Sequence, residues 1–447
     1  MLSLHKFLLR LDNQFGSAKT NFLVNGRKEL ANILWLYSSR VFKLFVGAIV
    51  GVWLARYLGP ESYGLLNYVV ALVGLFLSFS SLGLKPIVIQ NLVKDPESKE
   101  KTIGTATLLL FLGAIIAYSA LLVLVFYLHS DNVFERQIIC VFGLIIFFRV
   151  SDTCRFWFEA QLQSKRTVIT EGIAFTIVSV LKVIFILSES TLIYFVFLIL
   201  AESVLAAILI VRVFIKQKNQ FGTLNVSFPI AKSLIDRSWP LIIWVLSASA
   251  FNRIDQIMIG QILGQTQLGY YSAAVLISEM WYFVALATTA SLMPAFHRLY
   301  ERSEKEFDLK LQVLFRVMVI ISLPITLLVV IFSDWIILTI FGEAFNLSAS
   351  VLSIHALASV FVFLGQASFC WFIVKNKQKL VSVMTLMGLI LNIMLNVLFI
   401  PEYGIYGAAW ATFLSRVFVA LLGNLFFRET RILFKMMIKS LLVFGRS

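Results

Sequence analysis

The chain has 447 residues, of which 60% are apolar and 14% are charged. Soluble domains contain roughly 45–50% apolar and about 25% charged residues, so this composition excludes a soluble globular protein. The 38 Lys and Arg residues outnumber the 24 Asp and Glu residues and give a net charge of +14. Nucleic-acid-binding proteins concentrate their basic residues on one face. The apolar excess indicates instead a membrane protein with basic loops and no nucleic-acid partner.

The first thirty residues do not have the pattern of a cleaved signal peptide, because charged residues interrupt every apolar run. Leu4, Leu8, Leu11 and Phe15 recur at helical spacing. Such a pattern is typical of a helix that lies on the membrane surface. We therefore expect residues 1–30 to form an amphipathic segment on the cytoplasmic face.

Twelve apolar stretches follow, and each approaches the length of about 20 residues that a helix needs to cross a bilayer. We expect an all-α polytopic membrane protein with a six-helix lobe over 31–215 and a second over 239–427. A basic linker over 216–238 joins the lobes, and residues 428–447 form a basic cytoplasmic tail. The expected spans are 31–57, 64–84, 104–128, 137–158, 167–187, 191–213, 239–264, 269–294, 312–333, 351–374, 380–400 and 404–427.

The basic residues orient the chain in the membrane. If the N-terminus is cytoplasmic, the cytoplasmic segments hold 28 of the 38 Lys and Arg residues, and the outer loops hold Arg56 and Arg136. Cytoplasmic loops of membrane proteins carry an excess of Lys and Arg. The distribution therefore predicts that both termini are cytoplasmic.

A short repeat relates the two halves. Leu58-Gly59 is followed after four residues by Gly64, and Leu263-Gly264 is followed after four residues by Gly269. Six spans separate the two copies, so both halves enter the membrane in the same direction. Parallel repeats of this kind are related by an axis along the membrane normal. The repeat predicts two parallel six-helix lobes around a central cavity.

Several ionisable residues interrupt the expected spans. At the bilayer centre such a side chain costs at least about 2.5–3.5 kcal/mol and usually faces a cavity or a partner. The basic residues outnumber the acidic ones, which predicts a hydrated, net basic cavity. The basic residues expected to attract an anionic substrate headgroup are Arg40, Lys43, Arg149, Arg155, Lys182, Arg253 and Arg416.

Two groups of these residues allow a second interpretation. Arg149, Asp152, Arg155 and Glu159 are spaced by three, three and four residues. They therefore share one helical stripe and could neutralise one another. Arg40 and Lys43 carry like charges. Either an anion binds beside them, or both side chains reach the cytoplasmic surface.

Arg253 and Arg416 lie near the centres of their spans, so each either lines the cavity or pairs with an acidic residue. A salt bridge between Arg253 and Asp255 is as consistent with the sequence as binding of H+ or Na+ by that carboxylate. The three cysteines and four histidines are scattered and predict no metal site or other cofactor. The acidic residues expected to couple ions or to pair with basic residues are Asp152, Glu202, Asp255 and Glu279.

Enzyme signatures are absent from the sequence. It contains no phosphate-binding loop of the Walker type, no HExxH motif and no nucleophile elbow. The loops expected outside the membrane are short, whereas catalysis there would usually need a larger loop. The sequence therefore favours a transporter over an enzyme.

One stretch resembles a known family. The stretch from Arg253 to Trp281 is similar to the polysaccharide biosynthesis, or O-antigen flippase, family. The similarity lies in Arg253-Ile-Asp255-Gln-Ile-Met-Ile-Gly260, the second glycine turn, Gly269-Tyr-Tyr-Ser272 and Glu279-Met-Trp281. The Leu58-Gly59 turn matches the equivalent N-terminal element. The resemblance implies membership of the superfamily that also holds multidrug-extrusion antiporters and peptidoglycan-precursor flippases. It also implies two six-helix lobes and alternating access.

The same resemblance implies a substrate, a location and partners. The substrate would be an oligosaccharide repeat unit on undecaprenyl diphosphate, moved to the outer leaflet of the bacterial inner membrane. Arginine suits a diphosphate because its guanidinium donates to phosphate oxygens through a fixed fork. Membrane lipids and other polysaccharide-assembly membrane proteins would be partners. The alternatives are a multidrug or small-cation antiporter of the same superfamily and a membrane polysaccharide polymerase.

Overall fold

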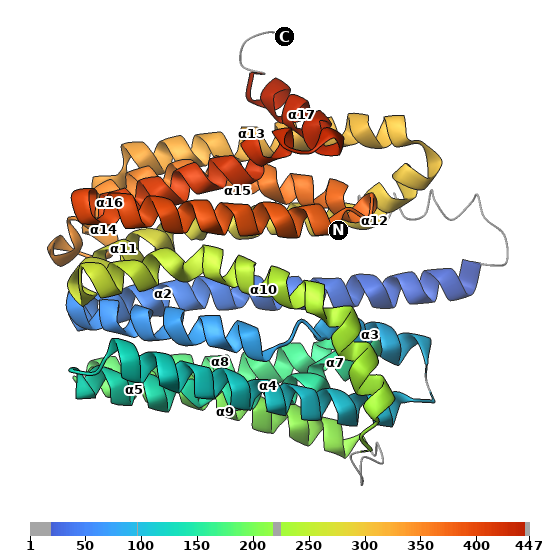
Figure 1. Cartoon of the computed structure of the whole chain (residues 1–447), viewed down its shortest axis with the longest axis horizontal. Helices are drawn as coiled ribbons and strands as arrows, with labels where there is room; N and C mark the ends of the chain where they lie inside the picture. Colours follow the sequence, from blue (N-terminus) through green and yellow to red (C-terminus); the bar gives the residue numbers. More distant parts are fainter. Residues whose placement is uncertain (1–18, 96, 218–224, 443–447) are drawn as a thin grey trace.

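The computed structural model describes residues 19–95, 97–217 and 225–442. Most of the expected amphipathic segment, residues 1–18, lies outside this part of the chain. Every regular element in the described residues is a helix (Figure 1). The N-terminal half contains α2 (Lys19–Ser80), α3 (Lys85–Lys94), α4 (Lys99–Leu128), α5 (Val133–Gly143), α6 (Ile145–Phe148), the 3-10 turn η1 (Arg149–Ser151), α7 (Asp152–Ala160), α8 (Ser164–Leu187) and α9 (Leu192–Lys216).

The C-terminal half is built of helices as well. Within it, α16 contains a non-helical break at Gly404, as α2 does at Gly59 in the N-terminal half. Its elements are α10 (Phe228–Ile262), α11 (Gln265–Glu279), α12 (Tyr282–Arg302), α13 (Glu304–Ile331), α14 (Ser333–Ile340), η2 (Glu343–Phe345), α15 (Ser348–Val374), α16 (Gln378–Ala420), η3 (Leu422–Leu425), η4 (Arg428–Thr430) and α17 (Arg431–Leu441).

These elements confirm the expected twelve crossings. In the described part of the chain, nine helical segments are long and apolar enough to span a membrane. The two that contain Gly59 and Gly404 each supply two crossings, and Figure 1 shows α2 folding back on itself. The short helices α5 to α7 together supply the twelfth crossing. The chain is therefore a multi-pass membrane protein.

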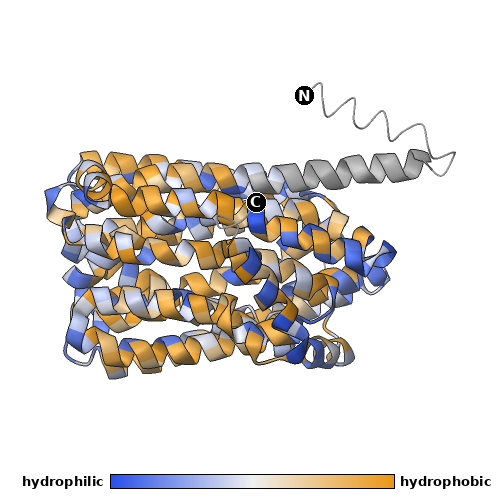
Figure 2. Ribbon diagram, turned by 90° about the horizontal axis from the view of Figure 1, so that it is seen from above, coloured by the Kyte–Doolittle hydropathy of each residue, from blue (hydrophilic) through white to orange (hydrophobic). Residues whose placement is uncertain are grey.

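The helices form the two expected six-helix lobes. In Figure 1, α2 to α9 lie in the lower half of the molecule, and α11 to α17 lie in the upper half. Helix α10 lies along the boundary beside α2, where Ser78 Oγ donates to Ser249 Oγ at 2.9 Å. Figure 2 shows apolar residues along the helices and hydrophilic residues gathered toward the ends of the bundle. This distribution suits a lipid environment around the bundle.

The repeated glycine turns, residues 58–64 and 263–269, adopt the same backbone conformation. Gly59 has φ 70° and ψ 173°, and Gly264 has φ 87° and ψ 175°. Positive φ values of this kind favour glycine, which has no Cβ. The sequence repeat therefore marks equivalent turns in the two lobes.

The two glycine turns also pack against each other. A Cβ on Gly64 would lie 1.7 Å from the Gln265 carbonyl oxygen, and a Cβ on Gly269 would lie 1.9 Å from the Pro60 carbonyl oxygen. Each turn thus places a glycine against the backbone of the other, which brings the lobes together at this end. We call it the glycine-turn end and name the opposite end, which holds loops 161–163 and 375–377, the basic end.

Two segments expected as linker and tail contain helices. Helix α10 begins at Phe228, so its first turns cover part of the expected 216–238 linker. Helix α17 occupies part of the expected 428–447 tail. Its inner face buries Leu433, Met436 and Met437 against the C-terminal lobe.

Candidate functional site

The fourth crossing is interrupted inside the membrane. Helix α5 ends at Gly143, where a Cβ would lie 2.7 Å from the Leu121 side chain. The short helix α6 follows, and then the 3-10 turn at Arg149–Ser151. Stretches of 3-10 helix within a longer helix often mark functional positions. Here the turn is followed directly by Asp152, the first residue of α7.

Five charged side chains from three crossings form a continuous line, which we call the ion chain. Asp152 accepts from Arg149 Nη1 at 3.0 Å and from Arg155 Nη1 at 3.2 Å. Arg155 Nη1 also lies 3.1 Å from Glu171 Oε1, and Lys43 Nζ lies 2.6 Å from Glu171 Oε2. The charges alternate along the chain and leave one positive charge in excess.

The ion chain lines a cavity of about 200 Å³ in the N-terminal lobe. The Nε atoms of Arg149 and Arg155 are buried and have no acceptor within the described part of the protein. An unsatisfied buried donor is costly, and more so for a charged group. Each guanidinium group therefore has one donor that the ion chain leaves unused. The lining residues are Lys43, Leu77, Ile145, Phe148, Arg149, Asp152, Arg155, Glu171, Glu202, Ser203 and Ala206.

The remaining basic residues expected in this lobe lie apart from the ion chain. Lys182 Nζ lies 3.7 Å from Glu202 Oε2. Arg40 is exposed on α2. The last member of the stripe in the fourth crossing, Glu159, accepts from Lys85 Nζ at 2.8 Å and not from Arg155. The stripe is thus partly neutralised within its own helix, and Lys43 is paired with a carboxylate from α8.

In the C-terminal lobe, Asp255 is held by uncharged donors. Its carboxylate accepts from the Tyr271 hydroxyl, from Thr412 Oγ1 at 3.2 Å and from the Gln256 N–H at 2.8 Å. Arg253 Nη1 instead donates to Gln256 Oε1 at 3.2 Å. Within 4.0 Å, Asp255 and Arg253 form no ion pair among the residues described.

The other two charges expected at the centre of this lobe lie nearby. Arg416 Nη2 donates to Asn252 Oδ1 at 2.6 Å, and its guanidinium lies 4.5 Å from the centre of the Phe251 ring. Glu279 is half-buried, and the positive charges that act on it are those of Arg253 and Arg416. The centre of the C-terminal lobe therefore holds two basic and two acidic side chains, Arg253, Arg416, Asp255 and Glu279, and in the described part of the chain no ion pair within 4.0 Å joins them.

The sequence assigns no role in the site to three residues that complete these clusters. Glu171 joins Lys43 to Arg155, and Tyr271 and Thr412 hold Asp255. Glu171 is an acidic residue within a span, which is the signal that could have drawn attention to it. The two hydroxyl residues carry no such signal, because their role depends on which helices meet.

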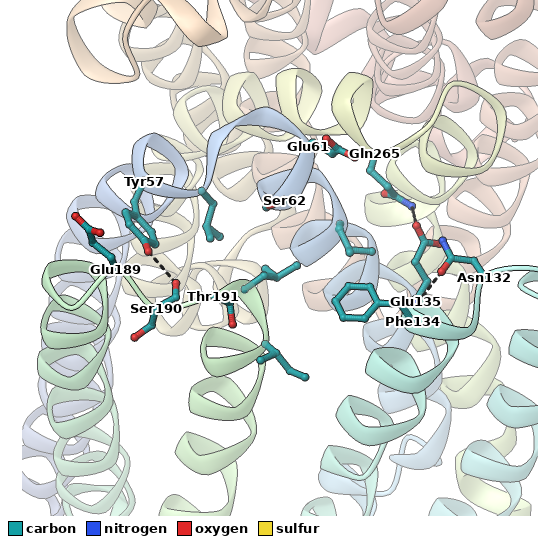
Figure 3. Close-up of a pocket in the computed structure, with 14 residues that line it drawn as sticks. Tyr57, Glu61, Ser62, Asn132, Phe134, Glu135, Glu189, Ser190, Thr191 and Gln265 are labelled. Carbon is teal, nitrogen blue, oxygen red and sulfur yellow. Dashed lines mark hydrogen bonds between the residues drawn. The ribbon is translucent and has the colours of Figure 1, made fainter.

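A second cavity, of about 730 Å³, opens at the glycine-turn end (Figure 3). Its lining includes the carboxylates of Glu61, Glu135 and Glu189, and Gln265 Nε2 lies 3.5 Å from Glu135 Oε1 across the lobe boundary. Beside it, the buried His129 Nε2 lies 3.2 Å from Gln261 Nε2. Burial lowers the pKa of the His129 imidazole, and the Glu135 carboxylate opposes this only in part.

Comparison with known proteins identifies the family. The profile of the polysaccharide biosynthesis protein family matches residues 30–300, which is more than half of the chain. The chain belongs to this family. The MatE family profile also matches residues 240–398. The resemblance seen in the sequence is thus confirmed.

Two curated relatives show weaker similarity. The "Probable low-salt glycan biosynthesis flippase Agl15" of Haloferax volcanii is 27% identical over 194 residues, which is 42% of this chain and 40% of that protein. The match therefore spans less than half of the Haloferax protein. The "Putative O-antigen transporter" of Shigella flexneri is 21% identical over 370 residues, covering 80% of this chain and 87% of that protein.

Solved structures share the fold. An inward-facing multidrug resistance MATE family transporter of the MOP superfamily superposes with a TM-score of 0.70 and 13% identity, covering 89% of this chain and 95% of the other. The lipid II flippase MurJ in an inward closed conformation gives a TM-score of 0.69 with 17% identity, covering 92% and 93%. At these identities the likeness establishes the two-lobe architecture.

Proposed function

We propose that this protein is a flippase for lipid-linked oligosaccharides. It would move repeat units of O-antigen or another surface polysaccharide, carried on undecaprenyl diphosphate, from the cytoplasmic to the periplasmic leaflet. Family membership and the relatives named as a flippase and an O-antigen transporter support transport over catalysis. The location is the bacterial inner membrane, with the basic end and both termini in the cytoplasm.

The cavity lined by the ion chain is the main support for this proposal. Three cations reach it, and the buried Nε atoms of Arg149 and Arg155 lack acceptors. A diphosphate offers several charged oxygens, and hydrogen bonds between guanidinium and phosphate are among the strong ones. The apolar lipid tail would stay in the bilayer while the headgroup occupies this cavity. Lys182, Arg40, Arg253 and Arg416 would act along the same path.

The acidic residues of the C-terminal lobe would couple transport to an ion. Asp255 and Glu279 lie inside the membrane without a direct ion pair, and Asp255 is supported by hydroxyl donors. Ionisable residues of this kind often belong to ion pathways. In this scheme the carboxylates take up H+ or Na+, while Asp152 and Glu202 serve to pair the basic side chains of the N-terminal lobe.

A deletion strain of the source organism tests the function. Without the protein, surface polysaccharide should be lost, and wild-type protein should restore it. Lys43→Ala and Arg253→Ala variants should reach the membrane at normal levels but fail to restore the polymer. Full restoration by both variants would contradict the proposed headgroup path.

A multidrug or small-cation antiporter is the second candidate, because the MatE profile matches much of the C-terminal lobe. Such a transporter would extrude cations, for which a net acidic path is expected. The ion chain instead carries an excess positive charge. Susceptibility of the deletion strain to cationic drugs distinguishes the two: unchanged surface polysaccharide with increased drug sensitivity would favour the antiporter.

A further inference from the structure

Glu171 holds a special position in the ion chain, because its carboxylate joins cations from two other helices. One oxygen lies 2.6 Å from Lys43 on α2, and the other lies 3.1 Å from Arg155 on α7. The Glu171 side chain comes from α8, lines the cavity and retains 25% of its surface exposed. It is therefore both a bridge between helices and accessible from the cavity.

Asp152 is held differently. Its two partners, Arg149 and Arg155, are three residues before and after it, so local geometry keeps these groups together. Its side chain is 12% exposed, about half the exposed fraction of Glu171. A change of the Glu171 side chain releases Lys43 and one side of Arg155, while Asp152 keeps both arginines in place. Of the two carboxylates, Glu171 is the one that an incoming anion can replace.

The cations offer the donors that such a replacement needs. Arg155 uses Nη1 for both of its carboxylate contacts, and its buried Nε has no acceptor among the described residues. Arg149 likewise uses Nη1 and leaves Nε without an acceptor. The diphosphate of a lipid-linked sugar has four non-bridging oxygens, two on each phosphate. It can therefore take the two places of the Glu171 carboxylate and still accept further hydrogen bonds.

We propose that Glu171 is an internal competitor of the substrate anion. In the empty protein, the Glu171 carboxylate pairs with Lys43 and Arg155. The phosphate of the substrate displaces this carboxylate when it binds. The return of the carboxylate to the two cations then helps to release the phosphate. This inference rests on the proposed flippase function and adds a residue that sets how tightly the headgroup binds.

The exchange keeps the cavity cations neutralised at both stages. Removing one partner of an ion pair leaves an uncompensated charge, and the cost of that charge rises with its burial. An exchange of one anion for another avoids that state in the empty protein and in the loaded protein. The displaced Glu171 carboxylate then lies at the cavity surface, where its exposure allows contact with water.

Binding of farnesyl diphosphate to the full chain in detergent micelles, measured by isothermal titration calorimetry, tests the proposal. Glu171→Gln removes the competing charge at nearly the same size. In wild type, the diphosphate must break two partly exposed ion pairs, and each can lower its binding constant by up to about fivefold. Without them, the affinity for farnesyl diphosphate should rise about tenfold. Lys43→Gln should lower affinity. Glu159→Gln is the matched control, since Glu159 also pairs with a lysine but lies outside the cavity lining, and affinity should stay within about twofold.

Release gives an independent readout. In cells, Glu171→Gln should reduce surface polysaccharide despite its tighter binding, because the carboxylate that displaces the phosphate is missing. Glu171→Asp keeps the charge on a shorter side chain and should lie between wild type and Glu171→Gln in affinity. A sharp size-exclusion profile of each variant establishes that it is folded.

The outcomes separate this proposal from the function it rests on. If Lys43→Gln weakens binding and Glu171→Gln leaves it unchanged or weaker, the competitor role is wrong and the headgroup site stands. If wild-type protein does not bind farnesyl diphosphate, the headgroup site itself is wrong, and the competitor role falls with it.

Discussion

Alanine at Gly64 or Gly269 adds a methyl group where the two glycine turns touch. The new Cβ would lie 1.7 Å from the Gln265 carbonyl oxygen in the first variant and 1.9 Å from the Pro60 carbonyl oxygen in the second. An ordinary contact begins near 3.4 Å, so each backbone would have to retreat by roughly 1.5 Å or more. Rotation of a side chain cannot relieve the contact, because the opposing atoms belong to the main chain.

The expected size of the effect follows from this crowding. Overpacking of a well-packed contact costs typically about 1–3 kcal/mol. Since about 1.4 kcal/mol changes an equilibrium constant tenfold, the population of the arrangement with the glycine turns in contact should fall by about fivefold to more than a hundredfold. The lobes should therefore separate at the glycine-turn end. Transport should also fall if it proceeds by the alternating access that the family resemblance implies, since that end would then have to close.

Distances between spin labels report this separation directly. Labels at Asp131 and Glu402, which are exposed at the glycine-turn end of the two lobes, can be introduced after Cys140, Cys154 and Cys370 are replaced by serine. Gly64→Ala and Gly269→Ala should shift the distribution to longer distances. Gly172→Ala is the control, because a Cβ there meets nothing within 4 Å. An unchanged distribution in both variants would refute the proposed contact.

Three further predictions concern the same protein. Gly59→Ala and Gly264→Ala place a side chain at positive φ, so each should lower the midpoint temperature of unfolding measured by fluorescence. The added volume should matter little, because no atom lies within 4 Å of a Cβ at either position. An unchanged midpoint would show that the turns rearrange freely. Burial lowers the pKa of His129, so the packed arrangement disfavours its protonation, and the contact at the glycine-turn end should weaken as the pH falls below the usual pKa of about 6.5. In wild type, the distance between the labels should therefore be longer at about pH 5.5 than at about pH 7.5. In His129→Gln the distance should not change with pH. Tyr271→Phe removes a donor to Asp255 and should shift the pH or Na+ dependence of transport, and a dependence identical to that of wild type would argue against a coupling role for Asp255.

Much of the fold follows from the sequence. The length of the apolar stretches sets the number of crossings, and the repeat of Gly59 and Gly264 predicts equivalent turns because their positive φ excludes most other residues. Helix ends are less predictable: α10 begins at Phe228 because polar residues can extend a helix beyond the membrane when a neighbouring lobe packs against it. The Ser227 N–H, for example, donates to Thr105 Oγ1 of α4.

The candidate site could be predicted only in part. Residue type and position show which charges lie inside the membrane, and the three-residue spacing predicts the contacts of Asp152 with Arg149 and Arg155. The contact of Lys43 with Glu171 joins residues 128 positions apart, so it depends on the packing of α2 against α8, which spacing within a single helix does not reveal. The same holds for Thr412 and Asp255, which are 157 positions apart.

In the proposed mechanism, the basic cavity carries the headgroup of a lipid-linked oligosaccharide across the membrane. Spheroplasts treated with periodate, which does not cross the membrane, measure how much of the lipid-linked repeat unit lies in the outer leaflet. Cells with wild-type protein or Glu159→Gln should expose most of this lipid to the reagent, and cells with Arg155→Gln or without the protein should keep it protected inside. Equal exposure in the presence and absence of the protein would contradict the account.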